Sequence, residues 1–329
     1  MYGEGRESFS FFQKIDMRLW FFKPSILFSK SANIFIQRNF FGKNPSIKFD
    51  RYAKKPFKTV QEGGDYLGSC LLSGEPRFFG RFGDVELFAC ADWDVRHKMA
   101  DQNFYRLQVN AGFFYNENKE EQRFYQTYID GFKNTDALGC WFTIGEDYMI
   151  KKYNPDLTLM PLRSYEPWYS DGTPWSAHLA GKKVLVISPF TDTIEAQYQK
   201  RDKLFEGTDI LPAFDLITYR SVNTRGKALD PRFDSWFDAL EFMKQEISKI
   251  DFDVAIAGCG AYTLPLCSHI KDMGKIAIQM GGATQLLFGI IGNRWKDNPT
   301  IQKYMNDSWT KVLPSDITAG TDIADRPYS

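Results

Sequence analysis

The sequence contains few of the residues that build metal centres and disulfide frameworks. Its three histidines are scattered over 329 residues without HExxH spacing, which excludes a histidine-rich metal centre. Its five cysteines form no CxxC pair, so neither a zinc ribbon nor a disulfide framework is expected. Four of them lie in apolar runs such as "ALGCWF", which is typical of buried free thiols in a reducing compartment.

Several catalytic motifs and targeting signals are also missing. No GxxxxGK[ST] sequence occurs, which disfavours a P-loop kinase, and no GxSxG sequence occurs, which excludes an esterase nucleophile elbow. The N-terminus has no secretory apolar region with a small-residue cleavage site. No apolar run reaches the roughly 18 residues that a membrane-spanning helix needs. We therefore expect a cytoplasmic protein that crosses no membrane.

The net charge is zero, but the charge is unevenly distributed. Residues 1–60 hold 12 Lys and Arg against 4 Asp and Glu, and the remainder carries the opposite excess. Apolar and basic residues interleave in this segment, which fits a peripheral contact with the anionic inner face of the cytoplasmic membrane. The pattern fits equally an arm that packs on the main domain or on a partner subunit. Nucleic acid is not expected as a partner, because the rest of the chain is acidic and contains no recognisable binding module.

The order of the expected elements divides the chain into an extension and one large domain. A basic, aromatic extension over 1–62 precedes a single domain over 63–329. This domain comprises an N-terminal lobe (about 63–180), a Rossmann-like half (about 181–296) and a tail (297–329), of which 310–329 is expected to be loosely ordered. In the N-terminal lobe the patterns predict helices over 84–100 and 119–133, strands over 77–83 and 136–145, and a strand followed by a turn over 105–115.

Residues 182–291 alternate between strands and helices. Helical patterns separate four apolar strand segments, which read "KKVLVISPF", "DLITYRSV", "DFDVAIAGCG" and "KIAIQMGG". Strands joined by helices form βαβ units, so we predict an α/β, Rossmann-like fold with a mostly parallel sheet flanked by helices. Ligands of such sheets bind beyond the carboxyl ends of the strands.

Two of these strands end in glycine-rich turns. Gly258 and Gly260 follow one strand, and Gly281 and Gly282 follow the next. Glycine lets a phosphate approach the backbone, and the N-terminus of the following helix attracts it, so a nucleoside diphosphate is a candidate ligand. The alternative is a tight turn between strand and helix. The GxGxxG fingerprint is incomplete because Thr263 stands at its third glycine, which leaves little support for an NAD-dependent oxidoreductase.

The stretch "GRFGDVELF" (80–88) places two carboxylates, Asp84 and Glu86, two residues apart after a glycine. Such a pair can bind Mg²⁺ or Mn²⁺ on a turn or a strand end, but side chains at i and i+2 diverge within a helix. The alternative is a helix start, with Asp84 as N-cap and Glu86 in the first turn. Asp92 and Asp94 form a rival pair, which lies inside the predicted helix, where the two carboxylates diverge.

The sequence "RFGDVE" (81–86) resembles the RFGDGE-type motif of bacterial glycosyltransferases with the GT-D fold, in which an acidic pair binds a divalent metal and the nucleotide-sugar diphosphate. Val85 stands where that family commonly has glycine. Further blocks within about 77–296 are similar to polysaccharide-biosynthesis proteins that carry this domain, among them "NAGFF", "EPWYSDGTPWSAHLAGKKVLVISPF", "FDVAIAGCGAY" and "GKIAIQMGGATQLLFGIIGNRW". The resemblance does not cover 1–60 or the tail.

The resemblance implies a function and a set of site residues. It implies transfer of a sugar, in particular a hexose, from a nucleoside diphosphate sugar to a glycan or lipid-linked glycan acceptor in bacterial surface polysaccharide assembly. By motif position, Asp84 and Glu86 would carry a divalent metal, Mn²⁺ or Mg²⁺, and Arg81 and Gly83 would complete the diphosphate site. A non-catalytic nucleotide-binding or scaffold protein of the same machinery is the alternative. An oligomer is compatible with both functions.

Four further residues are candidates by their place in the pattern. An inverting sugar transfer needs a general base near the acceptor hydroxyl. Glu146, at the end of an apolar strand, is the first candidate for this base, and Asp171, in a loop rich in proline and aromatics, is the second. Asn110 and Asn223, which lie at expected strand ends, are candidate contacts to a sugar or a base. Each of the four is also open to a structural role as a loop, cap or surface residue.

Overall fold

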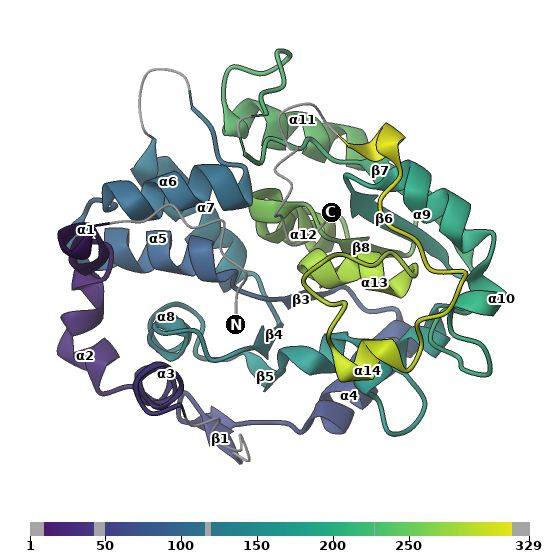
Figure 1. The fold of residues 1–329 in the computed structure, drawn as a ribbon, viewed down its shortest axis with the longest axis horizontal. Helices are drawn as coiled ribbons and strands as arrows, with labels where there is room; N and C mark the ends of the chain where they lie inside the picture. The colour runs from purple at the N-terminus through teal and green to yellow at the C-terminus, as the bar shows by residue number, and fades with distance from the viewer. Residues whose placement is uncertain (1–9, 43–49, 116–119, 227, 318–329) are drawn as a thin grey trace.

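A computed structural model describes residues 10–42, 50–115, 120–226 and 228–317, and its centre is one seven-stranded sheet (Figure 1). All seven strands are parallel and lie in the order β5-β4-β3-β9-β8-β6-β7. This confirms the predicted α/β, Rossmann-like fold. The strands are β3 (Arg77–Gly80), β4 (Ala137–Cys140), β5 (Thr158–Pro161), β6 (Lys183–Ser188), β7 (Asp215–Arg220), β8 (Val254–Ala257) and β9 (Ile276–Gln279).

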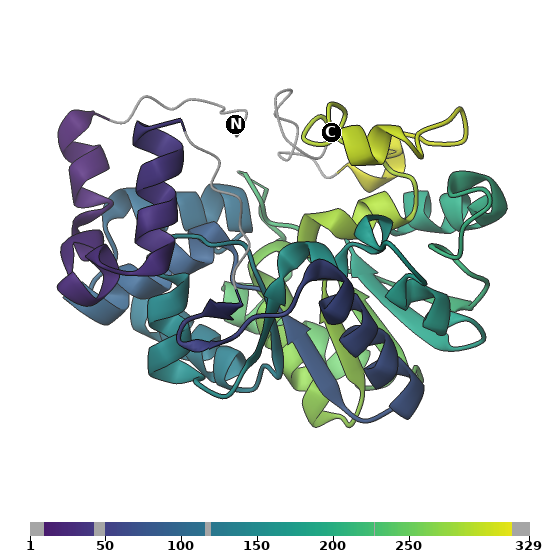
Figure 2. The same ribbon diagram turned by 90° about the horizontal axis from the view of Figure 1, so that it is seen from below.

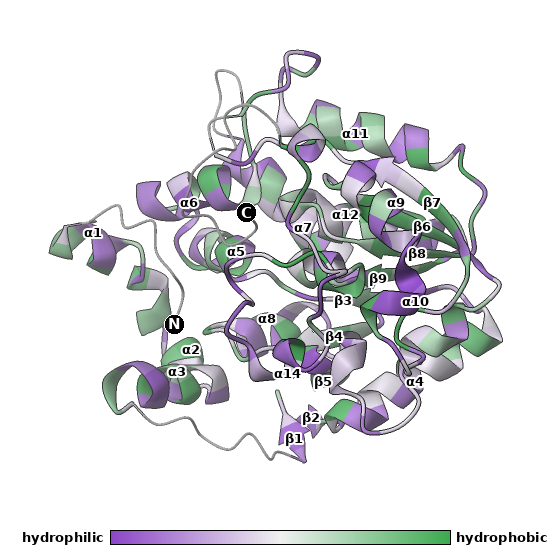
Figure 3. Ribbon diagram, turned by 45° about the vertical axis from the view of Figure 1, so that its right-hand side comes forward, coloured by the Kyte–Doolittle hydropathy of each residue, from purple (hydrophilic) through white to green (hydrophobic). Residues whose placement is uncertain are grey.

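The central strands are continuous apolar runs because both faces of the sheet are covered. Every residue of β4, β8 and β9 is buried, as expected for a parallel sheet between helices. Successive side chains of a strand point to opposite faces, so Leu185 and Ile187 of β6 join one hydrophobic core, whereas Val184 and Val186 join the other. Figure 3 shows the strands of the sheet mostly in green, the hydrophobic colour, between helices with polar outer faces.

Two layers of helices cover the sheet. One face carries α5 (Asp84–Arg96), α6 (Asp101–Ala111), α7 (Glu121–Lys133), α8 (Glu146–Tyr153), α11 (Trp236–Ile247) and α12 (Thr263–Asp272). The other carries α4 (Val60–Ser73), α9 (Thr191–Tyr198), α10 (Arg201–Leu204), α13 (Thr284–Leu287), α14 (Pro299–Gln302) and three single turns, η2 (Leu162–Tyr165), η3 (Pro167–Tyr169) and η4 (Trp175–Leu179). The connections from β3 to β5 and from β7 to β9 run along the sheet in one direction, and their helices lie on the first face. The connections from β5 to β7 run in the other direction and lie on the second face. Right-handed crossovers require this arrangement.

The N-terminal segment folds as short helices on the outer side of α5 and α8. These are α1 (Phe11–Asp16), η1 (Leu19–Phe22), α2 (Pro24–Leu27) and α3 (Lys30–Phe40), followed by the hairpin of β1 (Arg51–Tyr52) and β2 (Lys55–Pro56). Trp20 is fully buried against Phe88, with ring centroids 5.3 Å apart, and the Ser31 hydroxyl donates to Asp147 across 2.6 Å. This confirms the interpretation of an arm packed on the main domain. Parts of the predicted extension, 1–9 and 43–49, lie outside the described residues.

The structure corrects three expectations about local structure. The segment 105–115 is not a strand and turn, because α6 runs to Ala111 and ends at Gly112, which has a φ of 84°. Within the expected loose tail, residues 310–317 are held in place: Thr310 pairs with Ile290, and Asp316 is buried. Residues 318–329 lie outside the described part. The boundary at 62/63 falls inside α4, so helix α4 joins the extension to the domain without a linker.

Among the described residues, no helix is long and apolar enough to cross a membrane.

Candidate functional site

The carboxyl edge of the sheet is the place where the chain leaves successive strands in opposite directions. The segments after β3, β8 and β7 pass to the face that carries α5, α12 and α11, whereas those after β9 and β6 pass to the face that carries α13 and α9. The neighbours β3 and β9, β9 and β8, and β8 and β6 therefore send their loops apart. In open α/β sheets ligands bind in the crevice that such a divergence leaves. Figure 2 shows the loops of this edge below the N-terminal helices and α14.

Arg81, the residue after β3, is fixed across the ends of two strands. Its backbone N–H donates to Oε1 of Gln279, the last residue of β9, across 2.9 Å. Its guanidinium stacks 4.8 Å from the ring of Trp141 and lies so close to Gly281 that a Cβ there would be 3.0 Å from Nη1. The Trp141 indole in turn donates to the carbonyl of Phe82 across 2.8 Å. The edge thus presents a positive charge that is held in one place by a stacked ring.

The acidic pair of "RFGDVE" lies in the first turn of α5. Asp84 is the first residue of the helix and Glu86 the third, and Gly83, not Asp84, is the N-cap. Glu86 turns inward: it is 9% exposed, and its Oε2 lies 2.2 Å from the point where a Cβ on Gly83 would stand. The backbone therefore has the form of the alternative interpretation, a helix with an acidic first turn. A side chain at position 83 would displace the end of the Glu86 side chain, whereas the φ of −62° at Gly83 is open to any residue.

The two carboxylates nevertheless share one electrostatic environment. Burial, with a smaller contribution from the negative charge of Asp84, raises the pKa of Glu86 to about 7, while a hydrogen bond to its own backbone and the positive charges of Arg81 and Arg106 act in the opposite direction. Asp84 is partly exposed, with Oδ2 3.5 Å from Nη2 of Arg106. No group of three or more His, Cys, Asp or Glu that could hold a metal occurs among the described residues. The protein part of a metal site here would consist of these two carboxylates alone.

Asp92 and Asp94, the rival pair, diverge as their spacing within a helix predicts. Asp92 accepts from the backbone N–H of Ala100 across 2.6 Å and pairs with Arg96 across 3.1 Å. Asp94 faces another set of partners and accepts from the Tyr148 hydroxyl across 2.6 Å and from the Lys152 ammonium across 2.7 Å. Both carboxylates hold neighbouring helices together, and they do not form a common cation site.

The glycines of the turn after β8 lie where backbone segments approach one another. A Cβ on Gly258 would be 2.2 Å from the carbonyl oxygen of Gly281, and a Cβ on Gly260 would be 2.6 Å from that of Ala111. The Thr263 hydroxyl accepts from Cys259 N and donates to Gly260 O. These two hydrogen bonds lie within the turn and stabilise it. The positions of Gly258 and Gly260 are those of a tight turn, which adds nothing in favour of an NAD site.

The turn after β9 is partly exposed to solvent, as is the turn after β8. Gly281 and Gly282 are both half-exposed, and Gly281 has a φ of 63° in η6 (Gly281–Ala283). Of the two glycine-rich turns, this one lies beside the Arg81 guanidinium. A phosphate held by Arg81 would therefore meet the backbone of this turn, and the two predicted glycines here belong to the same part of the edge as the acidic pair.

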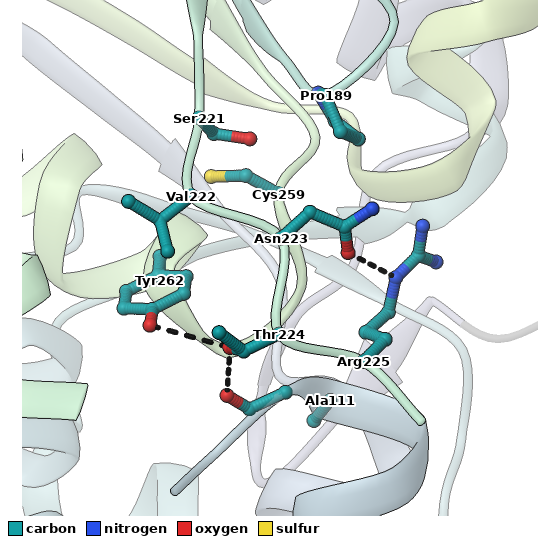
Figure 4. Close-up of a pocket in the computed structure, with 10 residues that line it drawn as sticks. Ala111, Pro189, Ser221, Val222, Asn223, Thr224, Arg225, Cys259 and Tyr262 are labelled. Carbon is teal, nitrogen blue, oxygen red and sulfur yellow. Dashed lines mark hydrogen bonds between the residues drawn. The ribbon is translucent and has the colours of Figure 1, made fainter. Parts of the chain in front are cut away.

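A small cavity lies beyond β6, β7 and β8 (Figure 4). Asn223 lines it, and its amide oxygen accepts from Nε of Arg225 across 3.3 Å. The Ser221 hydroxyl is buried and has no hydrogen-bond partner among the residues that the structure describes. The cavity has a volume of about 10 Å³, which is about the space of one water molecule. Burial raises the pKa of the Cys259 thiol in its wall to about 12, so this cysteine is not a thiolate nucleophile at neutral pH.

Asn110, the other predicted asparagine, is exposed near the end of α6. The neighbouring Val109 carbonyl accepts from Gly226 N across 2.9 Å, so the end of α6 and the loop that carries Asn223 are adjacent. The structure thus brings the two predicted asparagines to one side of the edge.

Glu146, the first candidate for a general base, is buried at the start of α8. It is 1% exposed, and its two oxygens accept from the backbone N–H groups of Trp141 and Phe142 across 3.2 and 3.0 Å. These bonds hold Phe142 at a φ of 61°, a conformation that costs free energy outside glycine. A base must reach the acceptor hydroxyl, and Glu146 does not reach the surface. Its position is that of a residue that shapes the loop carrying Trp141.

We expect Glu146 to make stability depend on pH. Burial raises its pKa to about 8, so between pH 4.5 and 8 the folded protein keeps a proton that the unfolded chain releases. The free energy of unfolding should therefore fall as the pH rises through this window, by up to roughly 5 kcal/mol from this group. Urea unfolding at pH 5, 6.5 and 8 should show a clearly smaller fall for Glu146→Gln. The exposed Glu75→Gln is the matched control, and parallel curves for Glu146→Gln and the wild type would contradict the assignment.

Asp171, the second candidate, is exposed on the loop after η3. Its backbone N–H donates to Oε1 of Gln61 across 2.8 Å, which ties the loop to the first turn of α4. Its carboxylate has no hydrogen bond or ion pair to Arg81, Asp84 or Glu86.

Glu166 is a carboxyl that the sequence interpretation did not single out. It lies between η2 and η3 and is half-buried. Burial raises its pKa to about 7, and the positive charges of Arg81, Arg163 and Arg294 oppose this rise. It therefore shares the environment of Arg81, which neither Glu146 nor Asp171 does. The block "EPWYSDG" contains Glu166, but the sequence alone does not show its charged surroundings, because the three arginines that act on it come from separate segments of the chain.

Comparison of the chain with protein-family models, with curated proteins and with solved structures finds no match.

Proposed function

We propose that the chain is a metal-dependent glycosyltransferase that moves a sugar from a nucleoside diphosphate sugar to a glycan or lipid-linked glycan acceptor, as in bacterial surface polysaccharide assembly. The position of Arg81 carries this proposal. Its guanidinium lies over Gly281 between the ends of β3 and β9, and Asp84 and Glu86 follow within one helical turn. A fixed positive charge beside two carboxylates, at the divergence of strand ends, suits a diphosphate with its cation.

Arg81 and Arg106 are the proposed diphosphate contacts. Guanidinium groups bind phosphate oxygens in pairs of parallel hydrogen bonds. Arg81 is held by the ring of Trp141, and Arg106 is held between Asp84 and the ring of Phe88, 5.5 Å from its centroid. Both are ordered before a ligand arrives, which reduces the entropy lost on binding and places positive charge where the leaving diphosphate gains negative charge.

Asp84 and Glu86 would hold the divalent cation. Both are oxygen donors, which suit Mn²⁺ and Mg²⁺, and two protein ligands are enough when substrate phosphates and water fill the remaining positions. The cation would neutralise the diphosphate as it leaves. The raised pKa of Glu86 means that its carboxyl must release a proton before it can act as a ligand. We assign the role of accepting the acceptor's proton to Glu166, because its carboxyl is partly exposed and the positive charge of Arg81 acts on its pKa.

The test is a thermal-shift screen of UDP-, GDP- and CMP-sugars with and without Mn²⁺. A ligand near 100 times its Kd adds about 2.7 kcal/mol to the free energy of unfolding, so we expect the melting temperature to rise by a few degrees only when nucleotide sugar and Mn²⁺ are both present. Asp84→Asn should lose this shift, with affinity at least ten-fold lower. Glu86→Gln should lose it as well, while both variants keep their fold by circular dichroism.

The matched control is Asp202→Asn, which changes an exposed acidic residue in the first turn of α10 and should leave the shift intact. An unchanged Mn²⁺-dependent shift in both Asp84→Asn and Glu86→Gln would remove the metal assignment. The inward position of Glu86 favours one second candidate, a nucleotide-binding protein without catalysis. That candidate requires the shift without release of UDP or GDP from the corresponding sugars, or of CMP from a CMP-sugar, with or without acceptor glycans. The proposed enzyme releases UDP or GDP from its donor.

A further inference from the structure

The outer side of the N-terminal helices carries an unusual number of exposed apolar side chains. Thirteen large hydrophobic side chains are exposed among the described residues, and eight of them lie between 11 and 41, with exposures from 39% to 84%. Single exposed hydrophobic residues are normal, but such a concentration on neighbouring helices is not. We call this set the outer aromatic surface; it comprises Phe11, Phe12, Ile15, Leu19, Phe22, Phe28, Phe40 and Phe41.

These side chains are not needed to attach the helices to the domain. That attachment is made from the other side by Trp20, Ile26, Ala32 and Ile34, which are all buried in the core. Helix α1 has no buried residue at all. The segment is therefore apolar on two sides, one that packs on α5 and α8 and one that faces solvent.

The charge around the outer aromatic surface has one sign. Between residues 10 and 42 there are five basic residues and one acidic residue, and this residue, Asp16, is paired with Arg96 of α5 across 3.0 Å. Lys14, Arg18 and Arg38 are exposed. Figure 3 shows hydrophobic green and hydrophilic purple alternating along α1 and α3. Aromatic rings interleaved with cations are the composition of helices that lie in the headgroup layer of an anionic bilayer.

An open groove of about 620 Å³ runs along α2 and α3 within this region. Its walls include the apolar side chains of Leu27, Phe28 and Ile36, and Lys30 lines it with them. An apolar wall beside a cation suits a phospholipid, because the acyl chain would contact the apolar wall and the phosphate headgroup would lie near the positive charge.

We propose that the outer aromatic surface docks on the surface of an anionic lipid bilayer, with its phenylalanines at the level of the headgroups and its basic side chains on lipid phosphates. A second copy of the chain is a poorer occupant, since two such surfaces would bring like charges together, and within the described range 10–42 the one acidic residue, Asp16, is already paired with Arg96. The rest of the chain carries excess negative charge and would turn away from the bilayer. The docked segment is adjacent to the candidate site, because Trp20 of η1 packs on Phe88, and Arg106, which pairs with Asp84, lies over the same Phe88 ring.

The experiment is vesicle flotation of the full chain at about 0.1 M salt. With vesicles of 70% phosphatidylcholine and 30% phosphatidylglycerol we expect the protein to float, and with phosphatidylcholine alone we expect at least about ten-fold weaker partitioning. The double variant Phe28→Ser with Phe40→Ser should lower partitioning at least ten-fold, and Lys14→Glu with Arg38→Glu at least ten-fold as well. The double variant Leu72→Ser with Leu229→Ser removes two other exposed apolar side chains and should leave flotation unchanged.

Equal flotation with neutral and anionic vesicles, or unchanged flotation of both surface variants, would overturn the proposal. Analytical sedimentation without lipid tests whether a second copy of the chain occupies the surface. If the protein is a dimer that Phe28→Ser with Phe40→Ser converts to a monomer, the surface is a dimer interface and the proposal of bilayer docking is overturned. Circular dichroism and the melting temperature show whether the variants are folded, since the changed side chains are exposed. The readout does not depend on sugar transfer, so the proposal stands or fails separately from the proposed function.

Discussion

Gly258→Ala should be among the most destabilising single substitutions in the chain. The new Cβ would lie 2.2 Å from the carbonyl oxygen of Gly281 and 2.7 Å from Oγ1 of Thr284. The first of these atoms belongs to the backbone, so relief requires the turns after β8 and β9 to move apart. Forced separation of packed segments costs roughly 1–3 kcal/mol and sometimes more, and we expect about 3 kcal/mol here because the atom that the new Cβ would meet belongs to the backbone.

The measurement is urea unfolding of Gly258→Ala beside a matched glycine. Gly64 lies inside α4, and a Cβ there would meet nothing closer than 3.9 Å, so Gly64→Ala should be neutral or stabilising by up to about 1 kcal/mol because alanine favours the helix. The Gly258 variant should also weaken any Mn²⁺-dependent nucleotide shift, since Gly281 lies beside Arg81. Equal stability of the two variants would show that the edge is more compliant than its packing indicates.

Gly258 also shows why a glycine pattern alone does not identify a ligand site. Glycine after a strand permits the close approach of either a phosphate or another backbone segment. The two cases have the same sequence pattern. The segment that approaches Gly258 lies 23 residues further on at Gly281. Only the order of strands β6, β8 and β9 brings the two turns together. A single sequence does not give that order.

The secondary structure of 182–291, where strands and helices alternate regularly, could be predicted from the sequence. The secondary structure of the preceding half could be predicted only in part. The strands β6 to β9 coincide with the segments predicted over 182–291. In β6, β8 and β9 the cause is burial on both faces, which requires apolar residues throughout. The edge strand β5 is only four residues long and ends in Pro161, which an edge tolerates but which resembles a loop in sequence. Helix α6 contains Phe104, Tyr105 and Val109, residue types that favour strands, and it is fixed by tertiary contacts.

The candidate site was predictable only in its contiguous part. Arg81, Gly83, Asp84 and Glu86 are neighbours in sequence, so a motif could name them. Their surroundings are not contiguous: Arg106 reaches Asp84 from α6, and Glu166 reaches the field of Arg81 from the segment after β5. The inward turn of Glu86 depends on the space above Gly83, which spacing alone does not reveal. In the sequence Glu146 fits the pattern of a general base. In the structure its oxygens accept hydrogen bonds from the backbone N–H groups of its own loop.

Asp316→Ala is the second substitution for which we expect a large loss of stability. Asp316 lies in the turn η7 (Pro314–Asp316), and its side chain is fully buried at the start of α9. Oδ2 accepts from the backbone N–H of Thr193 across 2.7 Å and from its hydroxyl across 2.5 Å, and Oδ1 accepts from Arg220 across 2.7 Å. A carboxylate at a helix N-terminus satisfies donors that otherwise lack partners. Removal of one partner of a buried charged pair typically costs about 3–5 kcal/mol, so we expect a loss of roughly 3–5 kcal/mol.

The same substitution should also release the end of the chain, because Asp316 is the residue that attaches this segment to α9. Leu313 N donates to the Thr193 hydroxyl across 2.9 Å, and this bond should weaken when the hydroxyl loses its acceptor. Urea unfolding measures the loss of stability, and hydrogen exchange should show faster exchange at Leu313 and Thr193. Asp202→Ala, an exposed carboxylate on α10, should stay within about 0.5 kcal/mol of the wild type. If Asp316→Ala behaves like Asp202→Ala, the ordered contact of 310–317 with α9 does not persist in solution.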